Sequence, residues 1–139
     1  MSNSDLEERA MAAPVIALFC GEQYEFYEQV PLARKRIDLV FVARHTPTTI
    51  SVELKIRDWK KALWQAVVNF QVSQESYIAI WHDYVHRVER HIDLLQRYGV
   101  GLISVERTTA RVVLKSSEQI GCIPSLQKQE WYRFLLNQK

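Results

Sequence analysis

Three charged residues near the middle of the chain have types and spacing suited to phosphate chemistry. Asp38 lies among apolar neighbours in the run RIDLVFVA, and Glu53 and Lys55 lie in the run ISVELK. The alternation of apolar and polar residues in the second run predicts a strand that carries Glu53 and Lys55 on one face. Two carboxylates and an ammonium that come together can hold a divalent cation and activate a water molecule.

The connection between the two runs predicts how they meet. It reads RHTPTT and is short, which favours an antiparallel hairpin. A pairing centred in this segment sets Asp38 opposite Glu53 or Lys55, and we expect the two carboxylates within about 6 Å of each other. The alternative is a solvated charge cluster on an exposed hairpin. Both runs are apolar enough for central strands, where two like charges repel unless a cation lies between them.

The first run also predicts which side of its strand carries the acid. If side chains alternate regularly, Ile37, Leu39 and Phe41 share one face, and Asp38 shares the other with Val40 and Val42. Asp38 is then a lone charge beside apolar side chains.

This pattern resembles the PD-(D/E)XK nuclease superfamily, which includes many restriction endonucleases and Holliday-junction resolvases. The match is Ile37-Asp38 followed by Glu53-Leu54-Lys55, with Ile37 in place of the usual Pro. The resemblance implies that Asp38 and Glu53 bind Mg²⁺ or Mn²⁺ and that the backbone carbonyl of Leu54 joins them. It also implies that Lys55 positions or activates the attacking water.

A helix is predicted after Lys55, with Asp58 placed to cap it. Gln65 and Asn69 lie on the flank of its apolar arc, so Gln65 is neither core nor fully exposed. Some branches of the superfamily carry a Gln in this helix, which implies that Gln65 orients a neighbour or a phosphate; a surface glutamine is the alternative. The apolar arc consists of Trp59, Leu63, Ala66, Val67 and Phe70.

One cluster of basic residues precedes Asp38, and a second follows Lys55. Such clusters are usually solvated surface, but here they are placed to meet phosphates, and the second also lies at a helix N-terminus, which favours anions. We therefore predict nucleic-acid contacts from Arg34, Lys35, Arg36, Arg57, Lys60 and Lys61.

Composition limits the class of protein. With 139 residues and 47% hydrophobic content, residues 1–139 are expected to form a single domain with its own core. A net charge of +2 provides no strong global field, so any affinity for DNA must come from local patches. Cys20 and Cys122 form no Cys-x-x-Cys pair, and neither a signal peptide nor a membrane span is evident, so we expect a cytoplasmic protein.

The predicted elements alternate between helix and strand. We expect a first helix in which Pro14 is placed to cause a kink, and a last helix from about Pro124 whose WYRFLL cluster favours a homodimer contact. This order predicts an α/β sandwich on a mixed sheet, and its core resembles the αβββαβ core of the restriction-endonuclease-like fold, with further strands and a helix at the C-terminus. Between the terminal helices we expect strands at 24–30, 36–43, 50–55, 76–81, 100–106 and 110–115 and helices from 58 and over 85–98.

The function expected from these residues is hydrolysis of the DNA backbone by a Mg²⁺-dependent endonuclease or exonuclease. The rival is a non-catalytic DNA-binding or assembly module on the same fold. Metal binding at Asp38 and Glu53 distinguishes the two, whereas the form of the nucleic acid and any sequence specificity are not evident from the chain.

Overall fold

The described residues of this computed structural model, 3–118 without 22, 33 and 47, form a six-stranded mixed sheet in the order β1-β2-β3-β4-β5-β6. The first three strands are antiparallel neighbours, β3, β4 and β5 run parallel, and β6 is antiparallel to β5. The strands are β1 (Tyr24–Leu32), β2 (Lys35–Ala43), β3 (Thr49–Lys55), β4 (Glu75–Trp81), β5 (Gly101–Val105) and β6 (Ala110–Leu114).

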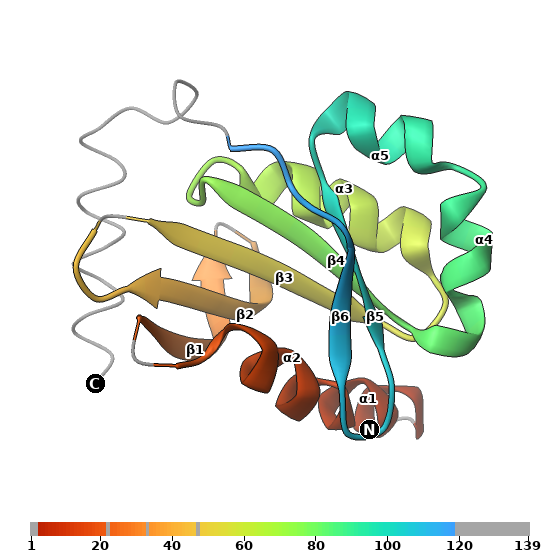
Figure 1. Cartoon of the computed structure of the whole chain (residues 1–139), viewed down its shortest axis with the longest axis horizontal. Coiled ribbons are helices and arrows are strands. Elements are labelled where there is room, and N and C mark those ends of the chain that lie inside the picture. The colour runs from red at the N-terminus through yellow and green to blue at the C-terminus, as the bar shows by residue number, and fades with distance from the viewer. Residues whose placement is uncertain (1–2, 22, 33, 47, 119–139) are drawn as a thin grey trace.

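Helices cover both faces of the sheet, so the predicted α/β architecture is confirmed at this level (Figure 1). One side carries α1 and α2, and the other carries the helices that connect the parallel strands β3, β4 and β5. The helical segments are α1 (Asn3–Ala10), α2 (Ala12–Phe19), α3 (Trp59–Asn69), the 3₁₀ turn η1 (His82–Tyr84), α4 (Val85–Glu89) and α5 (Ile92–Tyr98).

Two apolar clusters lie on opposite sides of the central strands. Val52 of β3 and Ala79 of β4 pack in the cluster that includes α2, whereas Ile78 packs with Leu63 and other residues of α3. Successive residues of a strand point to opposite faces, so a strand buried on both faces is nearly continuously apolar. The central strands are therefore covered by apolar side chains on both faces, and a charged group among them needs a specific partner.

The helix boundaries differ from the sequence predictions in two places. The first helix breaks at Met11 and not at Pro14, because Pro14 is the third residue of α2 and a first-turn proline gives up no intrahelical hydrogen bond. The helix predicted over 85–98 is divided at His91, whose φ of −117° and ψ of 27° are not helical and whose ring stacks on Trp59 at 4.8 Å. Gly99 ends α5 in the left-handed conformation.

The last predicted helix, with its proposed homodimer contact and Cys122, lies outside the described residues. Within the described part of the chain, no helix is long and apolar enough to cross a membrane.

Candidate active site

The β2–β3 hairpin brings the two acidic residues of the motif to the same end of the ladder. Leu39 pairs with Val52, which is the last pair of this antiparallel ladder on the side remote from the turn. The next residue of β2 is Asp38 and the next residue of β3 is Glu53. The predicted pairing register is therefore confirmed, and it follows from the length of the connection.

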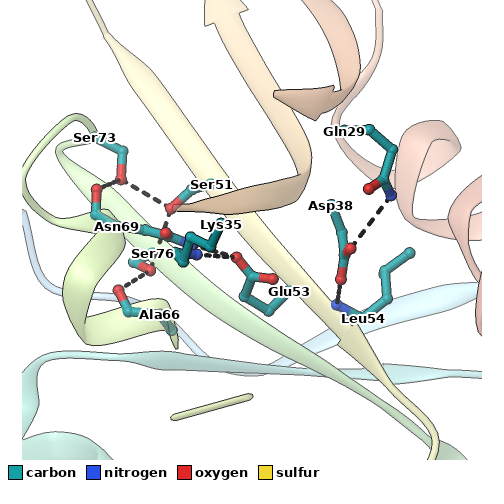
Figure 2. Close-up of polar contacts among 10 residues, drawn as sticks. All are labelled: Gln29, Lys35, Asp38, Ser51, Glu53, Leu54, Ala66, Asn69, Ser73 and Ser76. Atoms are coloured by element: carbon teal, nitrogen blue, oxygen red, sulfur yellow. Dashed lines mark hydrogen bonds and ion pairs between the residues drawn. The ribbon is translucent and has the colours of Figure 1, made fainter. Parts of the chain in front are cut away.

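Asp38 is held by hydrogen bonds from two neighbouring strands. Its Oδ2 accepts the backbone N–H of Leu54 at 2.8 Å, and its Oδ1 accepts the Nε2–H of Gln29 at 3.3 Å (Figure 2). The carboxylate is thus fixed by an amide of β3 and a side chain of β1. It faces a cavity of about 520 Å³, here called the Asp38 cavity, which is lined by Glu8, Arg9, Ala12, Glu28, Gln29, Asp38, Leu54 and Lys55.

The expectation that Asp38 shares a strand face with Val40 is wrong. Ile37 packs in the same buried cluster as Val40, whereas Asp38 lines a cavity with residues of α1. The alternation of β2 therefore shifts between Ile37 and Leu39. Gln29, which lies across from this point on β1, has a φ of 53°, and its irregular backbone interrupts the regular pairing there. The shift turns the carboxylate toward the α1 side of the sheet.

Glu53 is buried on the opposite side, against α3. Only 1% of it is exposed, and its Oε2 accepts hydrogen bonds from Asn69 Nδ2 at 2.6 Å and Lys35 Nζ at 3.0 Å (Figure 2). Burial raises the pKa of the Glu53 carboxyl to about 7, and the charge of Asp38 adds to the rise. Asn69 and Lys35 oppose it without cancelling it.

A serine network fixes the end of α3 that supplies Asn69. Ser73 Oγ donates to the Asn69 carbonyl at 2.8 Å, and its oxygen lies 2.8 Å from the hydroxyl of Ser51 on β3. Ser51 in turn donates to Ser76 of β4 at 3.2 Å. These bonds tie the C-terminal turn of α3 to the two strands beneath it, so the amide of Asn69 is held against Glu53.

Like Gln29, which donates to Asp38, Asn69 is a site residue that sequence reasoning did not select. It lies four residues after Gln65, on the same side of a helix, and this spacing was its only signal. Gln65 is half-buried, and its Oε1 has no hydrogen-bond partner among the described residues; the Oδ1 of Asn69 is also unpartnered there. The predicted role of Gln65 thus remains a prediction, one helical turn from the amide that holds Glu53.

Lys55 lies at the wall of the Asp38 cavity. Its ammonium lies 3.7 Å from Glu8 Oε2 of α1, and its side chain lines the cavity together with Asp38. The sequence placed Lys55 on the same strand face as Glu53, but the charged ends of the two side chains have different surroundings. Lys55 is the last residue of β3, and a long side chain at a strand end is free to turn toward a neighbouring helix.

The basic residues that follow β3 extend this surface. A cavity of about 310 Å³, here called the basic cavity, shares Glu8 and Lys55 with the Asp38 cavity. Arg57 and Lys61 line it, whereas the Lys60 ammonium lies 5.8 Å from the centre of the Trp59 ring. Three acids and three bases line this cavity, so its name refers to Arg57 and Lys61 and not to a net positive charge; the full lining is Glu7, Glu8, Lys55, Ile56, Arg57, Asp58, Lys61 and Tyr84.

The basic residues before Asp38 do not line the basic cavity. Lys35 forms the ion pair with Glu53, Arg36 donates from Nη1 to the Gln29 carbonyl at 3.2 Å, and Arg34 is exposed. Phosphate contacts by this group remain predictions, and a contact by Lys35 requires that it first leave Glu53.

No cluster of three or more His, Cys, Asp and Glu side chains suited to a metal ion occurs in residues 3–118 with their gaps. Asp38 and Glu53 nevertheless interact, because the charge of Asp38 contributes to the raised pKa of Glu53. The predicted separation of about 6 Å between their carboxylates stays a prediction.

Comparison with known proteins adds information on the fold alone. No family model matches the chain, and no curated protein matches it either. The structure is similar to that of the SPO1766 protein of unknown function from Silicibacter pomeroyi, with a TM-score of 0.66 and 15% sequence identity. The match covers 91% of this chain and 81% of that protein. At such low identity the likeness shows a shared fold and gives no activity.

Proposed function

We propose that this protein is a metal-dependent phosphodiesterase that hydrolyses the DNA backbone, with a PD-(D/E)XK type of site on a restriction-endonuclease-like core. The observation that carries the proposal is the meeting of Asp38 and Lys55 in one cavity, with Glu53 adjacent on β3. The element order from α1 and α2 through β1, β2, β3, α3 and β4 agrees with the αβββαβ core that the motif implies.

The residues suit a hard divalent cation. Glu53 is a buried carboxylate whose pKa is raised chiefly by burial and further by the charge of Asp38, and Asn69 and Lys35 oppose this rise only in part. Asp38 turns toward α1 and Glu53 toward α3, so a shared Mg²⁺ or Mn²⁺ requires one of the two carboxylates to turn around the end of the hairpin. Asp38 and Glu53 would then hold the ion, with the Leu54 carbonyl as a further oxygen ligand. When bound, such an ion would polarise the phosphate and lower the pKa of a bound water molecule.

The side chains of the protein supply orientation and charge. The Leu54 N–H holds one oxygen of Asp38 and so fixes the direction of the other. The Lys55 ammonium, in the same cavity, orients the attacking water and stabilises the charge that develops on the phosphate oxygens. Arg57 and Lys61 bind the adjoining phosphates, which keeps the strand in place for in-line attack.

The first test is cleavage of a panel of labelled nucleic acids. Wild type and Asp38→Ala are incubated with duplex, branched and single-stranded DNA and with RNA, in Mg²⁺, Mn²⁺ or EDTA. We expect metal-dependent cleavage of at least one DNA by the wild type and a loss of at least about 100-fold in Asp38→Ala, because a metal ligand is removed. Products are resolved on a denaturing gel.

The same panel separates the two candidate functions. If the wild type binds DNA in a gel-shift assay but cleaves no member of the panel with either metal, the nuclease proposal is wrong and the non-catalytic module is favoured. Cleavage that persists unchanged in Asp38→Ala points to a contaminating nuclease or to a different site.

A second prediction concerns salt. The affinity for DNA is expected to fall steeply as salt rises, and the double variant Arg57→Ala/Lys61→Ala should lower the slope of log K against log [salt] by roughly 1.5 to 2, since two phosphate contacts are lost. The control is Arg111→Ala/Lys115→Ala, which removes two exposed charges at the β6 edge. Equal slopes in the wild type and the first variant contradict a phosphate role for the basic cavity.

A further inference from the structure

A third cavity adjoins the basic cavity. It has a volume of about 410 Å³ and shares Glu7 and Ile56 with the basic cavity. The basic cavity itself shares Glu8 and Lys55 with the Asp38 cavity. Common walls make the three cavities neighbours along one path. This path starts at the candidate catalytic residues, passes Arg57 and Lys61, and ends at the third cavity, here called the Trp81 cavity.

The Trp81 cavity differs chemically from the other two. Its walls are mostly apolar, and its charged members are one acid from α1 and one base from the turn between β5 and β6, both exposed. The six lining residues are Glu7, Ala10, Met11, Ile56, Trp81 and Arg107.

The indole of Trp81 is held in place at the end of β4. It is half-buried against the apolar cluster that contains Met11, and its Nε1–H donates to Asp83 Oδ2 at 3.2 Å. The His82 ring lies 4.8 Å from it. Because the indole N–H already donates a hydrogen bond, a ligand can stack on the exposed part of the ring without leaving a polar group unpaired.

A flat heterocycle with polar edges fits these walls. An apolar slot with an indole accepts the faces of a nucleobase, Arg107 supplies donors and Glu7 supplies acceptors for its edge. The adjoining basic cavity accounts for the phosphate attached to such a base. A base in a duplex has both faces covered by its neighbours and must be unpaired and unstacked before it enters the cavity, whereas an unpaired nucleotide enters without that cost.

We propose that the Trp81 cavity binds the base of an unpaired nucleotide in a nucleic-acid strand whose adjoining phosphate lies on Arg57 and Lys61. The substrate class is then a single strand, or a duplex with an unpaired end or junction, and not an intact duplex. The direction of the strand toward Asp38 rests on the proposed nuclease function, whereas binding of the base is measured without cleavage.

The experiment compares binding of oligonucleotides in EDTA, where no cleavage occurs. A fluorescently labelled single strand, the same strand with one abasic nucleotide stepped along it, and the matching duplex are titrated with wild type, Trp81→Leu and Arg107→Met. The control is Trp64→Leu, which removes a more exposed tryptophan, 55% accessible, from α3. Melting curves confirm that each variant is folded, and Trp81→Phe replaces Trp81→Leu if the latter is not.

We expect Trp81→Leu to weaken binding of the single strand by roughly 5- to 150-fold, the range of one base stacked on an aromatic ring. Arg107→Met should weaken it by a smaller factor, and neither variant should change binding of the duplex. At one position of the strand, an abasic nucleotide should weaken binding to the wild type and have no further effect in the Trp81 variant.

The inference is overturned if the variants at Trp81 and Arg107 bind the single strand as the wild type does, or if every abasic position costs the same with and without the Trp81 indole. Coupling between the base and Trp81 in a protein that cleaves nothing leaves the inference intact and removes the nuclease proposal. Cleavage without that coupling supports the nuclease proposal and overturns the inference about the Trp81 cavity.

Discussion

Replacing Lys55 by alanine is expected to lower the cleavage rate by about 100- to 10,000-fold while the affinity for DNA changes little. The ammonium lies in the Asp38 cavity, where it acts on the water and the reacting phosphate. Binding depends on several cations, among them Arg57 and Lys61, so the loss of one has a modest effect. The fold should tolerate the change, because Lys55 and its partner Glu8 are both partly exposed.

The measurement is a single-turnover rate in Mg²⁺ together with a binding isotherm in Ca²⁺, which occupies such oxygen sites and often fails to support hydrolysis. Lys115→Ala is the matched control, because Lys115 is an exposed lysine after β6 that does not line the Asp38 cavity. Lys55→Arg is also informative: it keeps the charge but not the compact geometry of an ammonium, so we expect little rescue. Unchanged turnover in Lys55→Ala would remove this residue from the mechanism.

The second large effect concerns stability and its dependence on pH. In the folded protein the pKa of Glu53 is raised from its usual 4.5 to about 7. The folded state therefore binds a proton more tightly than the unfolded state, and its ionisation opposes folding. The cost is fully present above about pH 7, is relieved as the pH falls toward 4.5, and is absent below that value. This pKa difference corresponds to a folding cost of about 3 kcal/mol.

Glu53→Gln should remove most of this cost. The metal-free variant is expected to melt roughly 3 to 10 °C above the wild type at pH 8, and the gap should close as the pH approaches 5. The variant retains a side chain of the same shape in contact with Asn69, and Lys35 is exposed enough to reach water, so the ion pair is not needed to fill space. Asp38→Asn should give a smaller rise, since burial is a larger cause of the shift than the charge of Asp38.

Metal binding is expected to stabilise the wild type and not the variants. At a free Mg²⁺ or Mn²⁺ concentration ten times the dissociation constant, binding stabilises the wild type by about 1.4 kcal/mol, which is a few degrees. Glu53→Gln and Asp38→Asn should lose this rise. Calorimetric melting between pH 5 and 8, with EDTA or metal, measures both effects, and Glu89→Gln controls for loss of an exposed carboxylate. If Glu53→Gln melts below the wild type at pH 8 and responds equally to metal, the Lys35–Glu53 pair is structural and no cation binds there.

Local sequence patterns determined the helices and strands and most of their boundaries. The period of two in ISVELK and the apolar run SYIAIW predicted β3 and β4, and Asp58 marked the start of α3, where its side chain accepts the Lys61 N–H at 3.4 Å. These features could be predicted because strand periodicity and helix capping act between residues close in sequence. The length of the hairpin connection likewise predicted the register that brings Asp38 level with Glu53.

The tertiary structure decided where each charged group points. Regular alternation placed Asp38 beside Val40, but the positive φ of Gln29 on a neighbouring strand shifted the pattern and turned the carboxylate toward α1. Asn69 and Lys35 meet at Glu53 although they are 34 residues apart in the sequence, because β2 and α3 both pack against β3. The sequence by itself therefore determined which residues lie at the end of the β2–β3 hairpin. Which of them share a cavity depended on a backbone irregularity in β1 and on the contacts of α1 and α3, which arise between distant segments and leave no local pattern.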